Sequence, residues 1–380
     1  MAHLFFVKER TDRMTSVVEI FKETQWKKRT LLNSLILAVF AVSILSLMVG
    51  SISVSVSDVL LAIGHSILPN HIPEPQYAAA SVIIVKIRMP RILLAIIAGV
   101  SLGIAGTVMQ GTLRNPLVSP FTLGLSSAAA FGAAVSIVLG SSLFGAYDLS
   151  VNIAGQVFHK TDVLRISMAF IFGMLSVVII ILMSRNKRMS QSTLILSGVV
   201  ISYLFQAGIM FLKYISDNDQ LREVTSWLMG GLGIADWSTV IILAPIVLLS
   251  TYLMMVCSVQ FNTMSCGDEV AQNLGVDVNK LRRYSLLVVA FSVSACMSFT
   301  GVIGFIGLMA PHICRMIIGN DHRYLMPCSA VMGALILLTS DTVGRVITAP
   351  EDMPVGVIMY IIGGAFFLYL VVRGKGRGIE

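Results

Sequence analysis

The chain has 380 residues, of which 56% are hydrophobic and only 12% are charged. A soluble domain carries about 25% charged residues, so this composition excludes a protein that covers its surface with water-compatible groups. The formal net charge is +7, but the basic residues form no single patch. The charge is therefore explained by membrane topology and attraction to anionic membrane lipid, and no nucleic-acid partner is expected.

Several apolar runs reach the ~18–20 residues that a helix needs to cross ~30 Å of hydrocarbon. They are continuous rather than alternating, which favours α-helices over a β-barrel. The run Arg283–Ile318 is too long for one span, so we expect it to split near Thr300-Gly301. We predict an all-α polytopic membrane protein with about ten transmembrane helices, in one domain over residues 31–373. The predicted helices are Leu31–Ile52, Pro90–Leu113, Leu117–Leu139, Val163–Ser184, Thr193–Tyr214, Trp237–Val259, Arg283–Thr300, Gly301–Ile318, Leu325–Val346 and Pro354–Val372.

Residues 1–30 are polar and charged, without the short apolar segment and small-residue cleavage site of a signal peptide. We expect a cytosolic tail there, for which a short helix on the membrane surface is one form, and a second tail at residues 374–380. When ten helices are threaded through a membrane, most of the 27 Lys and Arg residues fall on the side of the N-terminus. The sequence therefore predicts a multi-pass protein of the cytoplasmic membrane with both termini cytosolic.

The second predicted helix carries polar residues at both of its ends. Arg88 and Arg91 flank Pro90 at its start, Gln110 lies near its far end, and a charged break follows at residues 114–116. Small residues recur between them, and such residues let helix backbones approach closely in a membrane. They are Ala98, Gly99, Ser101, Gly103, Ala105 and Gly106. The pattern predicts a tightly packed helix.

Motifs for catalysis or metal binding are not visible in the sequence. The five cysteines show no CxxC spacing, and the six histidines form no HxxxH or HExxH pair. Asp341 is the only acidic residue within a predicted span, whereas an ion-coupled carrier usually needs intramembrane carboxylates or broken helices. No GxxxxGK[ST] phosphate-binding sequence occurs. We expect no cofactor, no metal and no ATPase site in this chain; an ion-coupled secondary transporter and a membrane-embedded enzyme stay as alternatives.

The loop at residues 260–282 is the largest between predicted helices on the N-terminal side. Asp268 and Glu269 open a short helix that contains Ala271, with acidic groups at its positive end. Leu274 and Gly275 close it, with glycine as the turn residue. The loop is suited to docking of a cytosolic partner; the alternative is an ordinary surface loop.

The stretch RMPRILLAIIAGVSLGIAGTVMQGTLRNPLVSPFTLG resembles the signature of FecCD-family permeases, the membrane subunits of ABC importers for iron chelates, haem and cobalamin. In the second half, GVIGFIGLMAPHICRMIIGNDHRYLMPCSAVMGALILLTSDTVGRVI is similar to the same family. The resemblance covers roughly Val82 to Val372. It implies a type II ABC importer permease fold and a homodimer, with two cytosolic ATPase subunits that carry ATP and Mg²⁺. It also implies an extracytoplasmic binding protein that delivers a ferric siderophore-type chelate, or alternatively haem or cobalamin.

The resemblance also implies roles for individual residues. The short helix of the 260–282 loop would contact the ATPase. Arg88, Arg91 and Arg345 match positions at the outer mouth that hold carboxylates of the binding protein, which suits the bidentate guanidinium fork. Alternatively, these arginines are anchors that extend to the lipid headgroups. Asp341 lies four residues before Arg345 and either orients it or is solvated.

On the cytosolic side, the resemblance implies a gate at Gln191-Ser192. The glutamine departs from the small hydroxyl residues that are usual there. Asp321 is expected to cap the ninth predicted helix.

Two proline motifs complete the candidate residues, and Gln110 is grouped with them. Asn115-Pro116 and Pro311-His312 each place a polar residue beside a proline. Proline leaves a backbone carbonyl without its helical donor. We expect Asn115, His312 and Arg315 to satisfy such groups, a structural role rather than substrate chemistry.

Overall fold

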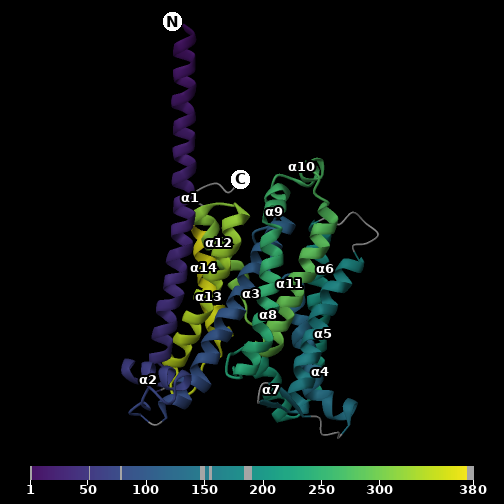
Figure 1. Cartoon of the computed structure of the whole chain (residues 1–380). Coiled ribbons are helices and arrows are strands. Elements are labelled where there is room, and N and C mark those ends of the chain that lie inside the picture. The colour runs from purple at the N-terminus through teal and green to yellow at the C-terminus, as the bar shows by residue number, and fades with distance from the viewer. Residues whose placement is uncertain are drawn as a thin grey trace.

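The computed structural model describes residues 2–50, 52–77, 79–145, 150–153, 156–183 and 191–374. Over these ranges long helices stand side by side in one bundle (Figure 1). The strands found in these ranges, β1 (Val151–Ile153) and β2 (Gln156–Phe158), form a short antiparallel hairpin. The predicted all-α membrane fold is confirmed.

Ten helices match the predicted ones in order. They are α1 (Ala2–Met48), α3 (Met89–Leu113), α4 (Leu125–Phe144), α5 (Lys160–Met183), α6 (Gln191–Ile215), α8 (Trp237–Val256), α11 (Val278–Thr300), α12 (Ile306–Ile318), α13 (His322–Ile347) and α14 (Val355–Gly374). The predicted loop helix is α10 (Asp268–Asn273). Further helices that the sequence analysis missed are α2 (Val56–Ile67), the π-helix η1 (Val82–Arg88), α7 (Asn218–Met229) and α9 (Ser258–Ser265).

Among the described residues, eight helices are long and apolar enough to cross a membrane. η1 and α3 count as one of them, because together they form a continuous stretch of 32 residues. The apolar parts of α4 and α12, Leu125–Gly140 and Ile306–Ile318, are shorter. All ten predicted helices are therefore present, but these two fall below the length of a full span.

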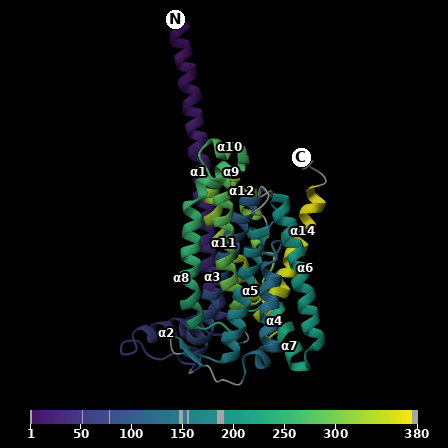
Figure 2. The same cartoon turned by 90° about the vertical axis from the view of Figure 1, so that its right-hand side faces the viewer.

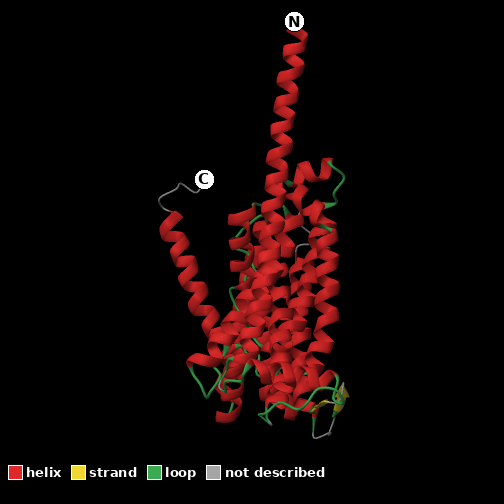
Figure 3. Cartoon of the chain, turned by 60° about the vertical axis from the view of Figure 1, so that its left-hand side comes forward, coloured by secondary structure: helices red, strands yellow, loops and turns green. Residues whose placement is uncertain are grey.

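The bundle has two distinct ends. α9 and α10 project at one end, where α14 also ends and beyond which the N-terminal part of α1 extends, and we call this the α10 end (Figures 1 and 2). α2, α7 and the β1–β2 hairpin lie at the opposite end, the α2 end (Figures 1 and 3). Polar clusters at these two ends are the candidate functional sites.

α1 differs from its prediction because it begins at Ala2 rather than Leu31. Residues 2–30 are helical and continuous with the apolar part of α1, and their cytosolic location stays a prediction. The sequence from Ala2 to Met48 contains neither glycine nor proline, so nothing in it ends a helix. The structure describes α14 as far as Gly374, and the rest of the predicted tail at residues 374–380 lies outside the described residues.

α3 is the central helix, and most of the apolar stretch that it forms with η1 is buried inside the bundle. Its small residues permit backbone contacts with α13 and α12. An added Cβ would lie 2.5 Å from Gly333 O at Gly99, and 1.7 Å from Gly307 O at Gly106. The predicted close packing is confirmed, and α3 becomes a rigid connection between the two ends of the bundle.

The predicted start of the third helix at Leu117 is wrong, because α4 begins only at Leu125. Ser119 and Thr122 form a local turn instead: Ser119 N donates to Thr122 Oγ1 at 3.0 Å, and Thr122 Oγ1 donates to Ser119 O at 2.8 Å. Such side-chain bonds compete with helix formation. Gly124, at φ 72°, then makes the turn into α4.

The predicted split of the long apolar run is confirmed. α11 ends at Thr300, and Gly301 adopts φ 67°, a left-handed conformation that glycine adopts without steric cost. α12 starts at Ile306, after a buried non-helical segment. Gly301 also packs tightly, since an added Cβ would lie 2.4 Å from Trp227 O.

Candidate functional sites at the two ends of the bundle

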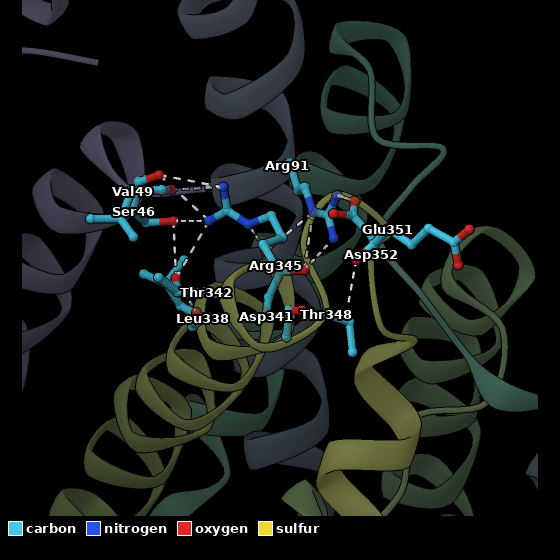
Figure 4. Close-up of polar contacts among 11 residues, drawn as sticks. Ser46, Val49, Arg91, Leu338, Asp341, Thr342, Arg345, Thr348, Glu351 and Asp352 are labelled. Carbon is cyan, nitrogen blue, oxygen red and sulfur yellow. Dashed lines mark hydrogen bonds and ion pairs between the residues drawn. The ribbon is translucent and has the colours of Figure 1, made fainter. Parts of the chain in front are cut away.

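The arginine cluster lies at the α2 end, and Arg91, Arg345, Asp341 and Asp352 form its main part (Figure 4). Arg88 completes it, since its guanidinium lies with that of Arg345 beside Gly50. Asp341 of α13 is the centre of the cluster, with a side chain only 1% exposed. Arg91 Nη2 and Nε donate to Asp341 Oδ1 at 2.9 and 3.0 Å. Arg345 Nε lies 3.2 Å from Asp341 Oδ2. Asp352, from the loop before α14, binds Arg91 from the other side.

The remaining guanidinium donors in the arginine cluster bind the end of α1. Arg88 donates to the carbonyls of Leu47 and Ile52. Arg345 Nη1 donates to Val49 O at 3.4 Å, and Arg345 Nη2 to Ser46 Oγ (Figure 4). The last carbonyls of a helix lack intrahelical donors. Arginine side chains from η1 and α13 supply donors there and tie α1 to the bundle.

The three predicted docking arginines are thus buried, with exposed fractions of 5% for Arg88, 8% for Arg91 and 5% for Arg345. Their guanidinium groups bind internal partners and do not face outward in this conformation. Docking to an outside carboxylate stays a prediction, and it requires these internal bonds to be exchanged. For Asp341 the alternatives are resolved: it orients both Arg345 and Arg91, and it is not solvated.

A cavity of about 260 Å³ opens beside the arginine cluster. Two ion pairs contribute to its wall, Arg91 with Asp352 and Arg165 with Glu223. The glycine-containing turn Gly230–Ile234 contributes backbone groups to the same wall. This concave site at the α2 end was not predicted, because its residues come from α3, α5, α7, α11 and the loops that follow α7 and α11 and precede α14.

In α12, the carbonyl that Pro311 leaves without a donor is satisfied by a residue other than those predicted. Pro311 has no N–H to donate to Gly307 O, and Gln110 Nε2 of α3 donates to that carbonyl at 3.3 Å instead. Arg315 Nη2 donates to Gln110 Oε1 at 2.8 Å. The structural role is as predicted, but Gln110 is the residue that satisfies the freed carbonyl.

The other predicted partners act elsewhere. Asn115 Oδ1 accepts from Leu117 N at 2.9 Å, so Asn115 stabilises the turn around Pro116. The ring of His312 packs against Phe366 and Phe367 of α14. Among the described residues, His312 Nδ1 has no hydrogen-bond partner.

The α10 cluster, at the opposite end, consists of Asp268, Arg282, Arg114 and Gln191. Arg282 Nη2 lies 3.1 Å from Asp268 Oδ2, and Arg114 Nη2 lies 3.2 Å from Asp268 Oδ1. Arg282 is 1% exposed and also donates to Thr112 O in the last turn of α3 at 3.3 Å. Asp268 thereby fixes α10 to the end of α3.

Arg114 has an unusual backbone conformation, with φ 44° and ψ 39° at the C-cap of α3. A non-glycine residue in this left-handed region costs roughly 1–2 kcal/mol. The tertiary contacts of its side chain hold it there. The predicted turn at Gly275, with φ 84°, closes α10 as expected.

α10 presents apolar side chains outward although it lies at the tip of a loop. Ala271 is the fully buried residue of α10, whereas Val270 is 45% and Leu274 65% exposed, and Glu269 beside Val270 is also exposed. Exposed apolar residues surrounded by polar ones are typical of protein-interaction sites. A Cβ added at Gly275 would meet no atom within 4 Å, so this side of the turn is open to a partner.

The predicted gate residues lie at the first turn of α6. With its amide oxygen directed at Arg114, Gln191 accepts from Arg114 Nε at 2.6 Å and Nη2 at 2.7 Å. Ser192 is exposed beside it. The structure therefore joins the predicted gate to the α10 cluster, a connection that no spacing in the sequence indicates.

A third polar group, the Asp321 cluster, joins α1, α9 and α13 at the α10 end. Asp321 caps α13, as predicted, by accepting from Arg323 N. Its carboxylate also binds Arg323 Nη2 at 2.9 Å, Asn262 Nδ2 at 2.9 Å and Lys28 Nζ at 3.2 Å. The Arg323 hydrogen bond, with those from Asn262 and Lys28, holds the pKa of Asp321 well below its usual range.

Comparison with known proteins identifies relatives over most of the chain. A family model described as the FecCD transport family matches residues 36–373. The hemin transport system permease protein HmuU of Yersinia pestis is 40% identical over 76% of this chain and 83% of its own length. The Fe(3+)-citrate import system permease protein YfmE of Bacillus subtilis is 34% identical, covering 92% of this chain and 97% of that protein.

Two further similarities extend the comparison. The cobalamin import system permease protein BtuC of Halobacterium salinarum is 37% identical over 79% of this chain and 76% of its own. A solved inward-facing structure, described as an ABC transporter of the metal-chelate type, aligns with a TM-score of 0.76 and 28% identity. It covers 91% of this chain and 99% of the solved one.

Proposed function

Since this chain belongs to the FecCD transport family, whose members are permease subunits of type II ABC importers, we propose that it carries a ferric siderophore-type chelate. The class of cargo for such permeases includes metal chelates, haem, cobalamin and molybdate. The iron-citrate and hemin relatives support an iron-containing cargo, and haem or cobalamin is the second candidate. Membership of this family favours an ATP-driven importer over the ion-coupled carrier and the membrane-embedded enzyme, the alternatives that the sequence leaves open.

The proposed orientation places the α10 end in the cytosol and the α2 end outside. The excess of Lys and Arg on the side of the N-terminus supports it. The proposed assembly is a homodimer with two cytosolic ATPase subunits and an extracytoplasmic binding protein. ATP and Mg²⁺ belong to the ATPase partner, and this subunit needs no cofactor of its own.

The exposed surface of α10 is the observation that supports the proposed function most strongly. Its apolar residues Val270 and Leu274 project beyond the bundle with Asp268 and Glu269 at its first turn. We assign this surface as the ATPase contact. Closure of the ATPase pair would move α10 and, through it, the helices that it touches, as a rigid-body switch.

At the α2 end, the binding protein is proposed to dock over the arginine cluster and the adjoining cavity. Because Arg88, Arg91 and Arg345 are paired internally, docking through them involves an exchange of partners. Such pairs influence register and association rate more than affinity. At the α10 end, Gln191 and Ser192 are proposed to form the cytosolic gate.

Co-purification with the ATPase tests the proposed function. The chain is expressed with the ATPase subunit from the same operon, as wild type and as a Glu269→Arg, Gly275→Pro variant. Proline cannot adopt the φ of 84° found at Gly275, and the arginine reverses the charge beside Val270. We expect wild type to retain the ATPase and the variant to lose it.

The matched control is Glu74→Arg, which reverses an exposed charge at the α2 end. It is expected to retain the ATPase. Proteoliposomes containing the assembled complex should accumulate a ferric chelate only when ATP is supplied. Uptake that needs no ATPase and follows an ion gradient would overturn the assignment.

A further inference from the structure

Asp268 connects α10 to α3 through two arginines that differ in burial. Arg282 has a side chain 2% exposed, and its Nη2 contacts both carboxylate oxygens of Asp268, at 3.2 and 3.1 Å. The same side chain donates to Thr112 O in the last turn of α3. Because this anchor is buried, α10 and the end of α3 behave as one body.

Arg114 is the exposed counterpart of Arg282. Its side chain is 35% exposed, and it reaches from the C-cap of α3 to Asp268 on α10 at 3.2 Å. With the Gln191 amide oxygen directed at it, Arg114 also donates to Gln191, from Nε at 2.6 Å and at 2.7 Å from Nη2, the same atom that contacts Asp268. One guanidinium group thus touches α10, the end of α3 and the first turn of α6.

The contacts of Arg114 are suited to exchange. Ion pairs near solvent contribute little stability, so little is lost when one opens. Gln191 is uncharged, so it accepts from Arg114 without competing with Asp268 for the positive charge. When the α10–α3 body moves relative to α6, the Arg114–Gln191 contact can open while the anchor at Arg282 persists.

We propose that Asp268, Arg114 and Gln191 form a releasable link that transmits the movement of α10 to the first turn of α6, with Arg114 and Gln191 as positioning residues for transport. The inference rests on the proposed function, because only the ATPase contact makes α10 the source of the movement. The contacts from Asp268 through Arg114 to Gln191 lie within this subunit. The link explains the glutamine at position 191, because the side chain of serine is too short to form the same contact.

Transport per ATP hydrolysed is the measurement that separates this role from a structural one. Proteoliposomes with the bound ATPase are compared for wild type, Asp268→Asn, Gln191→Ala, the double variant, and Arg114→Gln. We expect Gln191→Ala and Arg114→Gln to keep the ATPase bound and hydrolysing ATP, while uptake per ATP falls about fivefold or more. Asp268 lies in the α10 surface assigned to the ATPase, so uptake for Asp268→Asn is compared per ATP hydrolysed by the ATPase that it retains. The double variant should be no worse than the more affected single one, because both changes break the same link.

Arg283→Gln is the matched control. It removes the same charge one residue after Arg282, from an exposed side chain whose Nε donates only within α11, to Asn279 O. Uptake per ATP should stay at the wild-type value. Two results would overturn the link. One is a loss of uptake per ATP in the Asp268 and Gln191 double variant that equals the product of the two single losses. The other is wild-type uptake per ATP in Arg114→Gln.

A second measurement needs no partner and therefore separates this inference from the proposed function. The thermal midpoint of the purified chain in detergent is determined for wild type, Asp268→Asn, Gln191→Ala and the double variant. The same four proteins are then measured with Arg114→Gln added. We expect the two losses to be non-additive with Arg114 present and additive once it is replaced. Additive losses with Arg114 present would overturn the link even if the ATPase binds and transport occurs.

Discussion

The arginine cluster and the α10 cluster are built from the same chemistry at opposite ends of α3, yet they differ in burial. Asp341 is 1% exposed and binds two arginines that are themselves buried. Asp268 is 33% exposed and binds one buried and one half-exposed arginine. A buried ion pair cannot lose one partner without leaving an uncompensated charge, whereas an exposed pair exchanges partners with water at little cost. The α2 end is therefore fixed and the α10 end adjustable.

Replacing Asp341 with Asn should give the largest effect on stability. The change leaves Arg91 and Arg345 buried without their shared carboxylate, and breaking a buried pair in this way costs about 3–5 kcal/mol. The thermal midpoint in detergent measures the loss. Asp352→Asn is the control, because that carboxylate is 40% exposed and should cost about 1 kcal/mol or less. Equal losses in the two variants would contradict the importance given to burial.

Gly106→Ala tests the helix that joins the two clusters. The added Cβ would lie 1.7 Å from Gly307 O, so α3 and α12 must separate, at a cost of about 1–3 kcal/mol. Gly140→Ala in α4 is the matched control, since its Cβ would meet only Ser136 Oγ at 3.9 Å. The control is expected to be neutral or slightly stabilising, because alanine favours helix. A stable Gly106→Ala variant would mean that α3 is not closely packed.

Asp268→Asn should affect stability less than Asp341→Asn, because the Asp268 carboxylate and Arg114 are each about a third exposed and only Arg282 is buried. The stability that it loses should shrink further as salt rises from about 0.01 M to 1 M, since exposed charges are screened. The loss in Asp341→Asn should change little over the same range. Thermal midpoints of both variants against salt test the comparison directly.

The smallest expected effect concerns pH and the Asp321 cluster. Because the pKa of Asp321 in the folded protein is lowered by Arg323, Asn262 and Lys28, the cluster stabilises the folded state most fully above the unfolded Asp pKa of about 4. The stabilisation is lost as pH falls through the folded-state pKa. The gap in thermal midpoint between wild type and Asp321→Asn should therefore be constant near neutral pH and narrow in acid. A difference in thermal midpoint that widens in acid would show that the Asp321 carboxylate does not stabilise the folded state in the way described.

Several features of the fold follow from short stretches of sequence. Gly301 ends α11 and Gly275 closes α10, as predicted, because a left-handed turn favours glycine. Asp321 caps α13 for a similarly local reason. Where a local rule met a competing local bond, it failed: the Ser119–Thr122 turn delays α4 to Leu125.

The partners of the site residues were less accessible to sequence reasoning. Gln110 was grouped correctly with Pro311, but Gln110 and Gly307 are 197 positions apart, and nothing in the sequence indicates that their atoms meet. The pairing of Arg91 with Asp341 spans 250 residues. The contact of Gln191 with Arg114 depends on how α6 lies against the end of α3.

The sequence by itself determined the class of protein, the order of its helices and its family. A bilayer requires apolar runs of a fixed length with satisfied backbones, and that requirement appears in local composition. Only the tertiary structure decided which charges are buried and which are adjustable. Burial and partner choice depend on side chains brought together from distant helices, so Arg91 becomes part of a fixed core whereas Arg114, at the other end of the same helix, keeps contacts that it can exchange.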